Sequence, residues 1–387
     1  MELLSSLPLF VARCCQALHV AGFQAYPVGG CVRDLLLSRT PQDWDVCTSA
    51  LPSQVQALFP HTVPTGLAYG TVTVVLEGGT VEVTTFRQED RYGDGRRPDA
   101  VSFVSSLEAD LSRRDFTINA MAMAPDGQLL DPFGGRGDLQ RRSVRCVGKP
   151  ELRFREDRLR MFRAIRFAAQ LDFQLEGQLL QALMELGAQP HTLPPERIRP
   201  EVEKTLCAPA PHWAGLLFSS GLLSAFLPNR LEVETAILST LLPTPLARWA
   251  GLAALLRQEG ADPLPLLQGL IPDRALIVPL TKALALEVPT DARGWRHLLS
   301  RHGVTTCQAL AAMSPGSQPL QALENVLAQA PCISPKQLAL SGQDLMALGL
   351  SGIEIGRVQK TLLEHVLDHP EDNTPEKLVR QITSRRK

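Results

Sequence analysis

The alternation of hydrophobic and polar positions predicts β-strands in the first third of the chain. Apolar residues recur with a period of two in Phe23–Val28, Thr71–Leu76 and Thr80–Phe86, as expected for strands with one buried face. Residues 77–80, Glu-Gly-Gly-Thr, join the last two segments as a predicted hairpin turn. Short helical segments lie among these strands, so the region predicts a mixed head of helices and strands.

The pattern changes twice after these strands. Residues 88–99, QEDRYGDGRRPD, have no apolar period and predict a mobile loop. From Pro150 onward strand signals vanish, and helical segments separated by Pro and Gly continue to the end. We therefore expect an α+β protein of more than one packed unit, because 387 residues exceed what one core ordinarily supports. We expect a head at 1–142, a helical neck at 143–208, a helical body at 209–330 and a helical tail at 331–387.

Charge is concentrated in one segment. The formal net charge is only −1, yet residues 136–166 contain ten Arg and one Lys against four acidic residues. A nucleic-acid partner would therefore be bound by a local basic patch and not by the whole surface.

Composition also bears on the compartment. None of the eight cysteines forms a C-x-x-C pair, so we expect free thiols and a cytoplasmic protein. The N-terminus lacks the features of a signal peptide. The longest uncharged stretch, residues 205–229, leaves only Trp213–Leu227 as an apolar helix, which is too short to span a bilayer, so we expect no membrane partner.

Candidate chemistry begins at a glycine pair. Gly29 and Gly30 follow a predicted strand and open a short helix, where backbone N–H groups could approach a phosphate. Asp43 and Asp45 follow, and on a strand both carboxylates point to one face. Two hard oxygen ligands at this spacing fit a Mg²⁺ pair that clamps a phosphoryl group. Glu82 alternates with Val81 and Val83 and could add a third carboxylate; each of these acids could also be a solvated side chain on a strand.

The combination of motifs is more specific than any one of them. After GGxVRD at 29–34 and DxD at 43–45 come RRDFTINAM at 113–121, DPFGG at 131–135 with Asp138-Leu139, and REDRLRMFRAIRF at 155–167. In order and spacing these segments resemble the class II tRNA nucleotidyltransferase and bacterial poly(A) polymerase family. The resemblance implies a polymerase-β-like nucleotidyltransferase head on a helical neck, body and tail. It covers residues 28–170 closely, and the tail from Ile333 more loosely.

The resemblance also implies roles for individual residues. Asp43 and Asp45 would be the catalytic metal ligands; the strand alternation, and not the resemblance, adds Glu82 as a further candidate catalytic carboxylate. The residues expected to bind the nucleotide are Gly29, Gly30, Arg33, Arg114, Asp115, Asn119, Asp157, Arg160, Arg163 and Arg166.

The role of Asp157 and Arg160 has independent support. On one continuous helix, Leu159, Phe162, Ile165 and Ala169 share an arc that would pack, while Asp157 and Arg160 lie near the opposite side. Cytosine and adenine both present an amino donor beside a ring-nitrogen acceptor, so one acceptor and one donor can read both bases. Uracil and guanine present the reverse pattern. The alternative is an intrahelical salt bridge, which contributes only about 0.2–0.5 kcal/mol.

These observations predict a template-independent enzyme that adds CCA to the 3′ end of tRNA from CTP and ATP and releases pyrophosphate. The expected partners are Mg²⁺, the two nucleotides, and the acceptor stem and elbow of tRNA. Family members restricted to C lack a loop like residues 88–99, so its presence favours an enzyme that can add A. Two alternatives stay open: an enzyme that adds only the terminal A, and a non-catalytic tRNA-binding relative. The oligomeric state is also open, with a homodimer as one option.

Overall fold

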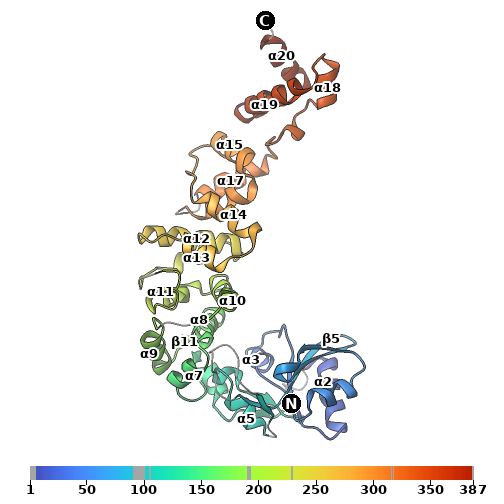
Figure 1. Ribbon diagram of the computed structural model, residues 1–387, viewed down its shortest axis with the longest axis vertical. Helices are drawn as coiled ribbons and strands as arrows, with labels where there is room; N and C mark the ends of the chain where they lie inside the picture. The colour runs from blue at the N-terminus through green and yellow to red at the C-terminus, as the bar shows by residue number, and fades with distance from the viewer. Residues whose placement is uncertain are drawn as a thin grey trace. The chain divides into compact units, whose positions relative to one another are not determined.

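The structure is a computed structural model that describes residues 6–89, 101–103, 106–189, 193–227, 230–314, 316 and 318–385. It contains two compact units, residues 1–236 (unit 1) and 237–387 (unit 2). Unit 1 holds a mixed β-sheet with helices, and the described part of unit 2 is built from helices, as Figure 1 shows. The α+β class is therefore confirmed, while the four finer boundaries stay a prediction.

The sheet of unit 1 has five strands in the order β1-β2-β5-β4-β3. Their bounds are β1 Ala25–Pro27, β2 Asp45–Thr48, β3 Thr62–Gly66, β4 Thr71–Leu76 and β5 Gly79–Thr85. Strands β2 and β5 run parallel, and the other neighbours run antiparallel. The predicted hairpin is confirmed, because Leu76 pairs with Gly79 across a two-residue turn whose Gly78 has φ +99°.

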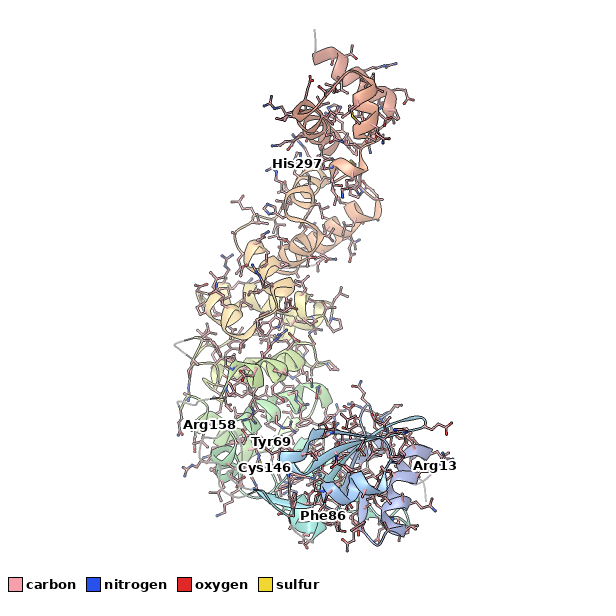
Figure 2. All side chains as sticks on the ribbon, turned by 45° about the vertical axis from the view of Figure 1, so that its right-hand side comes forward. Arg13, Tyr69, Phe86, Cys146, Arg158 and His297 are labelled. Carbon is pink, nitrogen blue, oxygen red and sulfur yellow. The ribbon has the colours of Figure 1, made fainter. Side chains whose placement is uncertain are left out.

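Helices α2 and α4 contact this sheet, and its core includes Val28, Cys47 and Phe86. Phe86 is labelled in Figure 2. The helices of unit 1 are α2 Leu9–Val20, α3 Gly30–Leu36, α4 Pro52–Leu58, α5 Leu107–Ser112, α6 Gly135–Gln140, α7 Pro150–Glu156, α8 Leu159–Leu171, α9 Gly177–Leu186, α10 Pro195–Leu206 and α11 Gly215–Ser219, with 3₁₀ turns at Leu67–Tyr69, Thr117–Asn119 and Pro211–Ala214. The shorter strands are β6 Arg87–Glu89, β7 Val101–Phe103, β8 Ala122–Met123, β9 Leu129–Leu130, β10 Ser143–Val144 and β11 Gln174–Leu175.

Several details differ from the sequence expectations. The first two residues of the expected loop belong to β6, which pairs antiparallel with β7, and residues 90–99 lie outside the described ranges. The structure contains a strand after Pro150, because β11 pairs with β10 in parallel. The expectation of helices alone beyond Pro150 is therefore wrong in this detail. The apolar segment Trp213–Leu227 is helical only to Ser219, since Gly221 with φ +80° begins a run of turns.

Unit 2 packs short helices around its own apolar core. Their bounds are α12 Pro245–Gln258, α13 Leu264–Leu270, α14 Arg274–Ala283, α15 Ala292–His302, α16 Val304–Ala312, α17 Gln318–Ala328, α18 Gly342–Ala347, α19 Ile353–Asp368 and α20 Pro375–Arg385, with 3₁₀ turns at Ala236–Thr240, Pro335–Gln337 and Pro370–Asp372. Near its C-terminus, Leu345, Leu362, Val366 and Leu378 form a buried cluster. Across the part of the chain that the structure describes, each helix is too short or too polar to cross a bilayer.

Candidate active site

The expected phosphate-binding turn is present between β1 and α3. Gly29 has φ +83° and ψ −130°, a conformation that L side chains rarely adopt. A Cβ atom at this position would lie 2.9 Å from Nη1 of Arg114, so a larger residue would also have to displace that side chain. The N–H of Gly29 donates to the carbonyl of Met121 at 3.0 Å, and the N–H of Val28 donates to the carbonyl of Asp45. The turn is thereby held against the start of β2.

Three carboxylates gather where β2 and β5 begin to pair. Asp45 is the first residue of β2, and its Cα lies opposite that of Glu82 on β5. Burial raises the pKa of Asp45 to about 6; the charge of Arg114 opposes this rise, and the charges of Glu82 and Asp43 add to it. Asp43 lies in the bend before β2, so the expectation that both aspartates share a strand is wrong in detail. The carboxylates of Asp43, Asp45 and Glu82 nevertheless face one cavity.

The cavity is open to solvent and has a volume of about 1160 Å³. Besides these acids, the cavity is lined by a group of arginines, here called the arginine wall, that includes Arg33, Arg113, Arg114 and Arg163. Within the described ranges, no three His, Cys, Asp or Glu side chains lie close enough to hold a metal ion by themselves. A cation at Asp43 and Asp45 would thus take further ligands from a phosphate or water, as Mg²⁺ commonly does.

Asp115 links the head to α8. Its Oδ2 accepts hydrogen bonds from Nε and Nη2 of Arg163 at 2.7 and 2.6 Å, and its Oδ1 accepts one from Asn119. Asn119 in turn accepts a hydrogen bond from Arg33 at 2.8 Å. Burial would raise the pKa of Asp115, but Arg163, Arg160 and Asn119 outweigh it and bring the pKa to about 2. Three of the expected nucleotide-binding residues, Arg33, Asn119 and Arg163, are therefore tied together through Asp115.

The segment around Asp157 is not the single helix that the sequence predicted. Helix α7 ends at Glu156 and α8 begins at Leu159, with Asp157 in an extended conformation between them. Oδ1 of Asp157 accepts from the N–H of Leu159, and Oδ2 accepts from Nη2 of Arg197 on α10 at 3.0 Å. Arg158, labelled in Figure 2, instead contacts the carbonyls of Leu186 and Gln189.

Arg160 is not on a free face, which corrects the helical-wheel expectation. Its side chain lines the cavity but only 6% of the residue is exposed. Nη1 donates to Oε2 of Glu156 at 2.6 Å, and Nη2 donates to the carbonyl of Arg113 at 3.2 Å. The expected packing face is confirmed for Phe162, Ile165 and Ala169, which are fully buried.

Arg166 contacts α10 and a neighbouring residue of its own helix, α8. Its Nε donates to Glu201 on α10 at 2.5 Å and its Nη1 to Gln170, while the guanidinium lies 4.0 Å from the centre of the Phe167 ring. The residue lines the cavity, and these contacts fix its direction.

Residues that sequence reasoning missed complete the site. Arg197 pairs with Asp157, and Glu201 pairs with Arg166. Asp110 pairs with both Arg113 and Arg114. The spacing of Asp110 to Arg113 and Arg114, three and four residues on a helix end, was the one signal available in the sequence.

Comparison with known proteins identifies the family. A CCA-adding enzyme of Geobacillus sp. (strain WCH70) is 39% identical over 380 residues, which cover 94% of this chain and 93% of that protein. The chain belongs to the CCA-adding enzymes. A second member of this family, from Limosilactobacillus fermentum, is 37% identical over 90% of each chain. Models of the poly A polymerase head domain and of the probable RNA and SrmB-binding site of polymerase A match residues 25–145 and 172–232.

Solved structures agree with the family assignment. The CCA-adding enzyme of Bacillus stearothermophilus in complex with CTP superposes with a TM-score of 0.76 at 33% identity, covering 97% of each chain. The Thermotoga maritima CCA-adding enzyme complexed with tRNA has a TM-score of 0.64 at 22% identity, which indicates a shared fold.

Proposed function

We propose that this chain adds CCA to the 3′ end of tRNA from CTP and ATP, without a nucleic-acid template, and releases pyrophosphate. The observation that carries the proposal is one cavity that is lined both by Asp43, Asp45 and Glu82 and by the arginine wall. Family membership over almost the whole chain supports it, as does the CTP complex of the Bacillus stearothermophilus relative. In the reaction, the 3′ hydroxyl oxygen bonds to the α-phosphorus as the bond to the β-phosphate breaks.

The carboxylates fit a divalent metal. Asp43 and Asp45 supply hard oxygen ligands beside the phosphate-binding turn, and the raised pKa of Asp45 means that a bound cation would be needed to favour its charged form fully. Bound Mg²⁺ supplies Lewis-acid activation of the attacking hydroxyl and charge neutralisation of the leaving pyrophosphate. Glu82, beside Asp45, would add negative potential to the same rim.

The arginine wall would bind the triphosphate. Arg33 and Arg114 lie next to the Gly29 turn, where backbone approach to a phosphate is closest. Their positive charge would compensate the phosphate oxygens, and Asn119, which lines the same cavity and accepts a hydrogen bond from Arg33, would approach the ribose or the triphosphate. These residues act by holding the nucleotide in line with the attacking hydroxyl.

Asp157 and Arg160 would read the base. The carboxylate of Asp157 uses two of its roughly four acceptor sites on Leu159 and Arg197, which leaves capacity for an amino group. Arg160 lines the same cavity, and its guanidinium is held by Glu156 and by the carbonyl of Arg113, so its position is fixed beside the base that it would read. Cytosine and adenine fit this acceptor–donor pair, whereas uracil and guanine would leave it unsatisfied, at a cost of roughly 1–3 kcal/mol for each good pair.

Transfer RNA would bind through phosphate contacts from the helical residues after 140. The excess of arginine between residues 136 and 166 supports this part of the proposal.

One primer-extension experiment tests the whole function. Three tRNA transcripts ending in the discriminator base, in C and in CC are incubated with Mg²⁺ and with CTP or ATP separately. We expect CTP to extend the first two and ATP the third. Extension only of the CC transcript by ATP would identify an A-adding enzyme, and binding without extension of any transcript would identify a non-catalytic relative.

A further inference from the structure

A buried carboxylate outside the expected motifs lies at the centre of the arginine wall. Asp110, on α5, has no exposed surface. Its Oδ1 accepts from Nε and Nη2 of Arg113 at 2.9 and 2.8 Å, and its Oδ2 accepts from Nη2 of Arg114 at 3.2 Å. The backbone N–H of Arg87, the first residue of β6, also lies 3.4 Å from Oδ1. One carboxylate thus orients two adjacent guanidinium groups and the start of a strand.

Asp110 keeps its charge in this buried position. Burial alone would raise the pKa of the carboxyl, but the charges of Arg114 and Arg113 and the hydrogen bond from Arg113 lower it. Asp110 holds two guanidinium groups side by side at the cavity, and the carboxylate of Asp45 also acts on the charge of Arg114. Two adjacent positive charges favour an anionic ligand in the cavity beside them.

The two arginines are directed at the region where the phosphates would bind. Both line the cavity, and Arg114 Nη1 lies beside the Gly29 turn. Nε of Arg114 is buried and has no hydrogen-bond partner among the described residues, although a buried N–H is normally satisfied. The carbonyl of Arg113 accepts a hydrogen bond from Arg160, so the same segment also contacts the expected base-reading side chain.

We propose that Asp110 is a positioning residue that holds Arg113 and Arg114 against the triphosphate of the incoming nucleotide. The inference rests on the proposed nucleotidyl transfer and adds to it Asp110 and Arg113. CTP and ATP share the triphosphate, so Asp110 affects both nucleotides equally and has no part in choosing the base.

The test compares the full-length chain with its Asp110→Asn variant. Asparagine keeps the shape but removes the charge that orients both guanidinium groups. We expect KM for CTP, KM for ATP and the inhibition constant of pyrophosphate to rise by a similar factor. That factor is roughly ten- to a hundredfold, the loss expected for one or two hydrogen bonds to charged groups. The preference for CTP and ATP over UTP and GTP should not change.

Asp138 provides a matched control. It is also a buried aspartate that holds two arginines, Arg141 and Arg145, but neither of these lines the cavity. Asp138→Asn should lower the melting temperature about as much as Asp110→Asn and leave KM for the nucleotides close to wild type. If both variants raise KM by the same factor, the effect is one of stability and the inference is wrong.

The outcomes separate the inference from the proposed function. Absence of nucleotide addition by the wild-type chain would contradict the function itself. Wild-type KM and pyrophosphate inhibition in a folded Asp110→Asn variant would overturn only the role of Asp110. If that variant does not fold, Arg113→Gln leaves Asp110 paired with Arg114 and should still raise KM for both nucleotides; an unchanged KM there would also overturn the inference.

Discussion

Asp115 in unit 1 and Asp368 in unit 2 both have a pKa of about 2, but their surroundings differ. Asp115 is buried beside the cavity, where Arg163, Arg160 and Asn119 outweigh the effect of burial on its pKa. The side chain of Asp368 is 31% exposed, and hydrogen bonds from Arg293 and His297 lower its pKa. His297 is labelled in Figure 2.

The different surroundings of Asp115 and Asp368 correspond to different roles for the two aspartates and their basic partners. In unit 1, the buried Asp110 and Asp115 hold arginines that line the cavity. At the surface of unit 2, Arg293 and His297 on α15 hydrogen-bond to Asp368 at the C-terminal end of α19, and so hold the two helices together. Equal pKa values therefore do not imply equal energetic weight, because solvent and salt screen the exposed pair. The predictions below test this contrast, beginning with the largest expected effect.

The largest effect should come from acids of unit 1 that face the cavity. Asp43→Ala or Asp45→Ala should lower nucleotide incorporation by orders of magnitude, because each would remove a proposed metal ligand. Affinity for tRNA should stay nearly unchanged, since we propose that basic residues elsewhere bind its phosphates. Single-turnover extension and a filter-binding titration measure the two quantities. Near wild-type turnover in either variant would contradict the metal assignment.

The next effect concerns base choice. Arg160→Ile should reduce discrimination against UTP and GTP by roughly 1–3 kcal/mol, or about one to two decades in relative kcat/KM. Arg153→Ile is the matched control, because Arg153 also pairs with Glu156 but does not line the cavity. Single-nucleotide addition with each of the four nucleotides measures the preference. Unchanged exclusion of UTP and GTP in Arg160→Ile would contradict a role in base reading.

A third prediction concerns acid stability. The pKa of Asp115 is lower in the folded chain than its ordinary value of 3.8, so its charge stabilises the fold above about pH 4. That contribution, about 2 kcal/mol, should be lost as pH falls from 4 to 2. Asp115→Asn should therefore destabilise the chain at pH 7 and approach wild type near pH 2. Urea unfolding at several pH values gives the difference, and a pH-independent gap would contradict it.

The smallest effect should come from unit 2. Asp368→Asn should lower the free energy of unfolding by less than about 1 kcal/mol, and added salt should shrink the difference. The effect of Asp115→Asn should persist in salt, because that pair is buried. Thermal unfolding at low and high ionic strength compares the two. A larger, salt-independent loss for Asp368→Asn would remove the contrast between the units.

The order of apolar, polar and glycine residues predicted those parts of the fold that are determined by residues adjacent in the sequence. The β4–β5 hairpin and the glycine turn before α3 follow from alternation and from residues that favour turns. Strand β3 was missed because Pro64 and Gly66 disfavour a strand, and an edge position tolerates them. The loop at residues 88–99 was expected to favour an enzyme that can add A, and that expectation stays a prediction.

The site was predictable as a set of residues but not as a set of contacts. A helical wheel considers one helix, so it placed Arg160 on a free face. The chain instead brings the carbonyl of Arg113, 47 residues away, against it. In the same way, Asp157 pairs with Arg197, a residue too distant in the sequence for any local spacing to indicate the contact.

The break between α7 and α8 has a consequence for engineering. Within an unbroken helix, the backbone of each residue keeps a fixed orientation relative to that of its neighbours. Asp157 lies in the joint, where α10 sets its direction through Arg197, whereas Arg160 is carried by α8. Asp157 is thus bound both by α8, through the N–H of Leu159, and by α10, whereas Arg160 is held by Glu156 and the carbonyl of Arg113. If the two residues read the base as proposed, substitutions along α10 that move Arg197 would shift the acceptor relative to the donor, which makes α10 a promising helix for selecting variants with a new base preference.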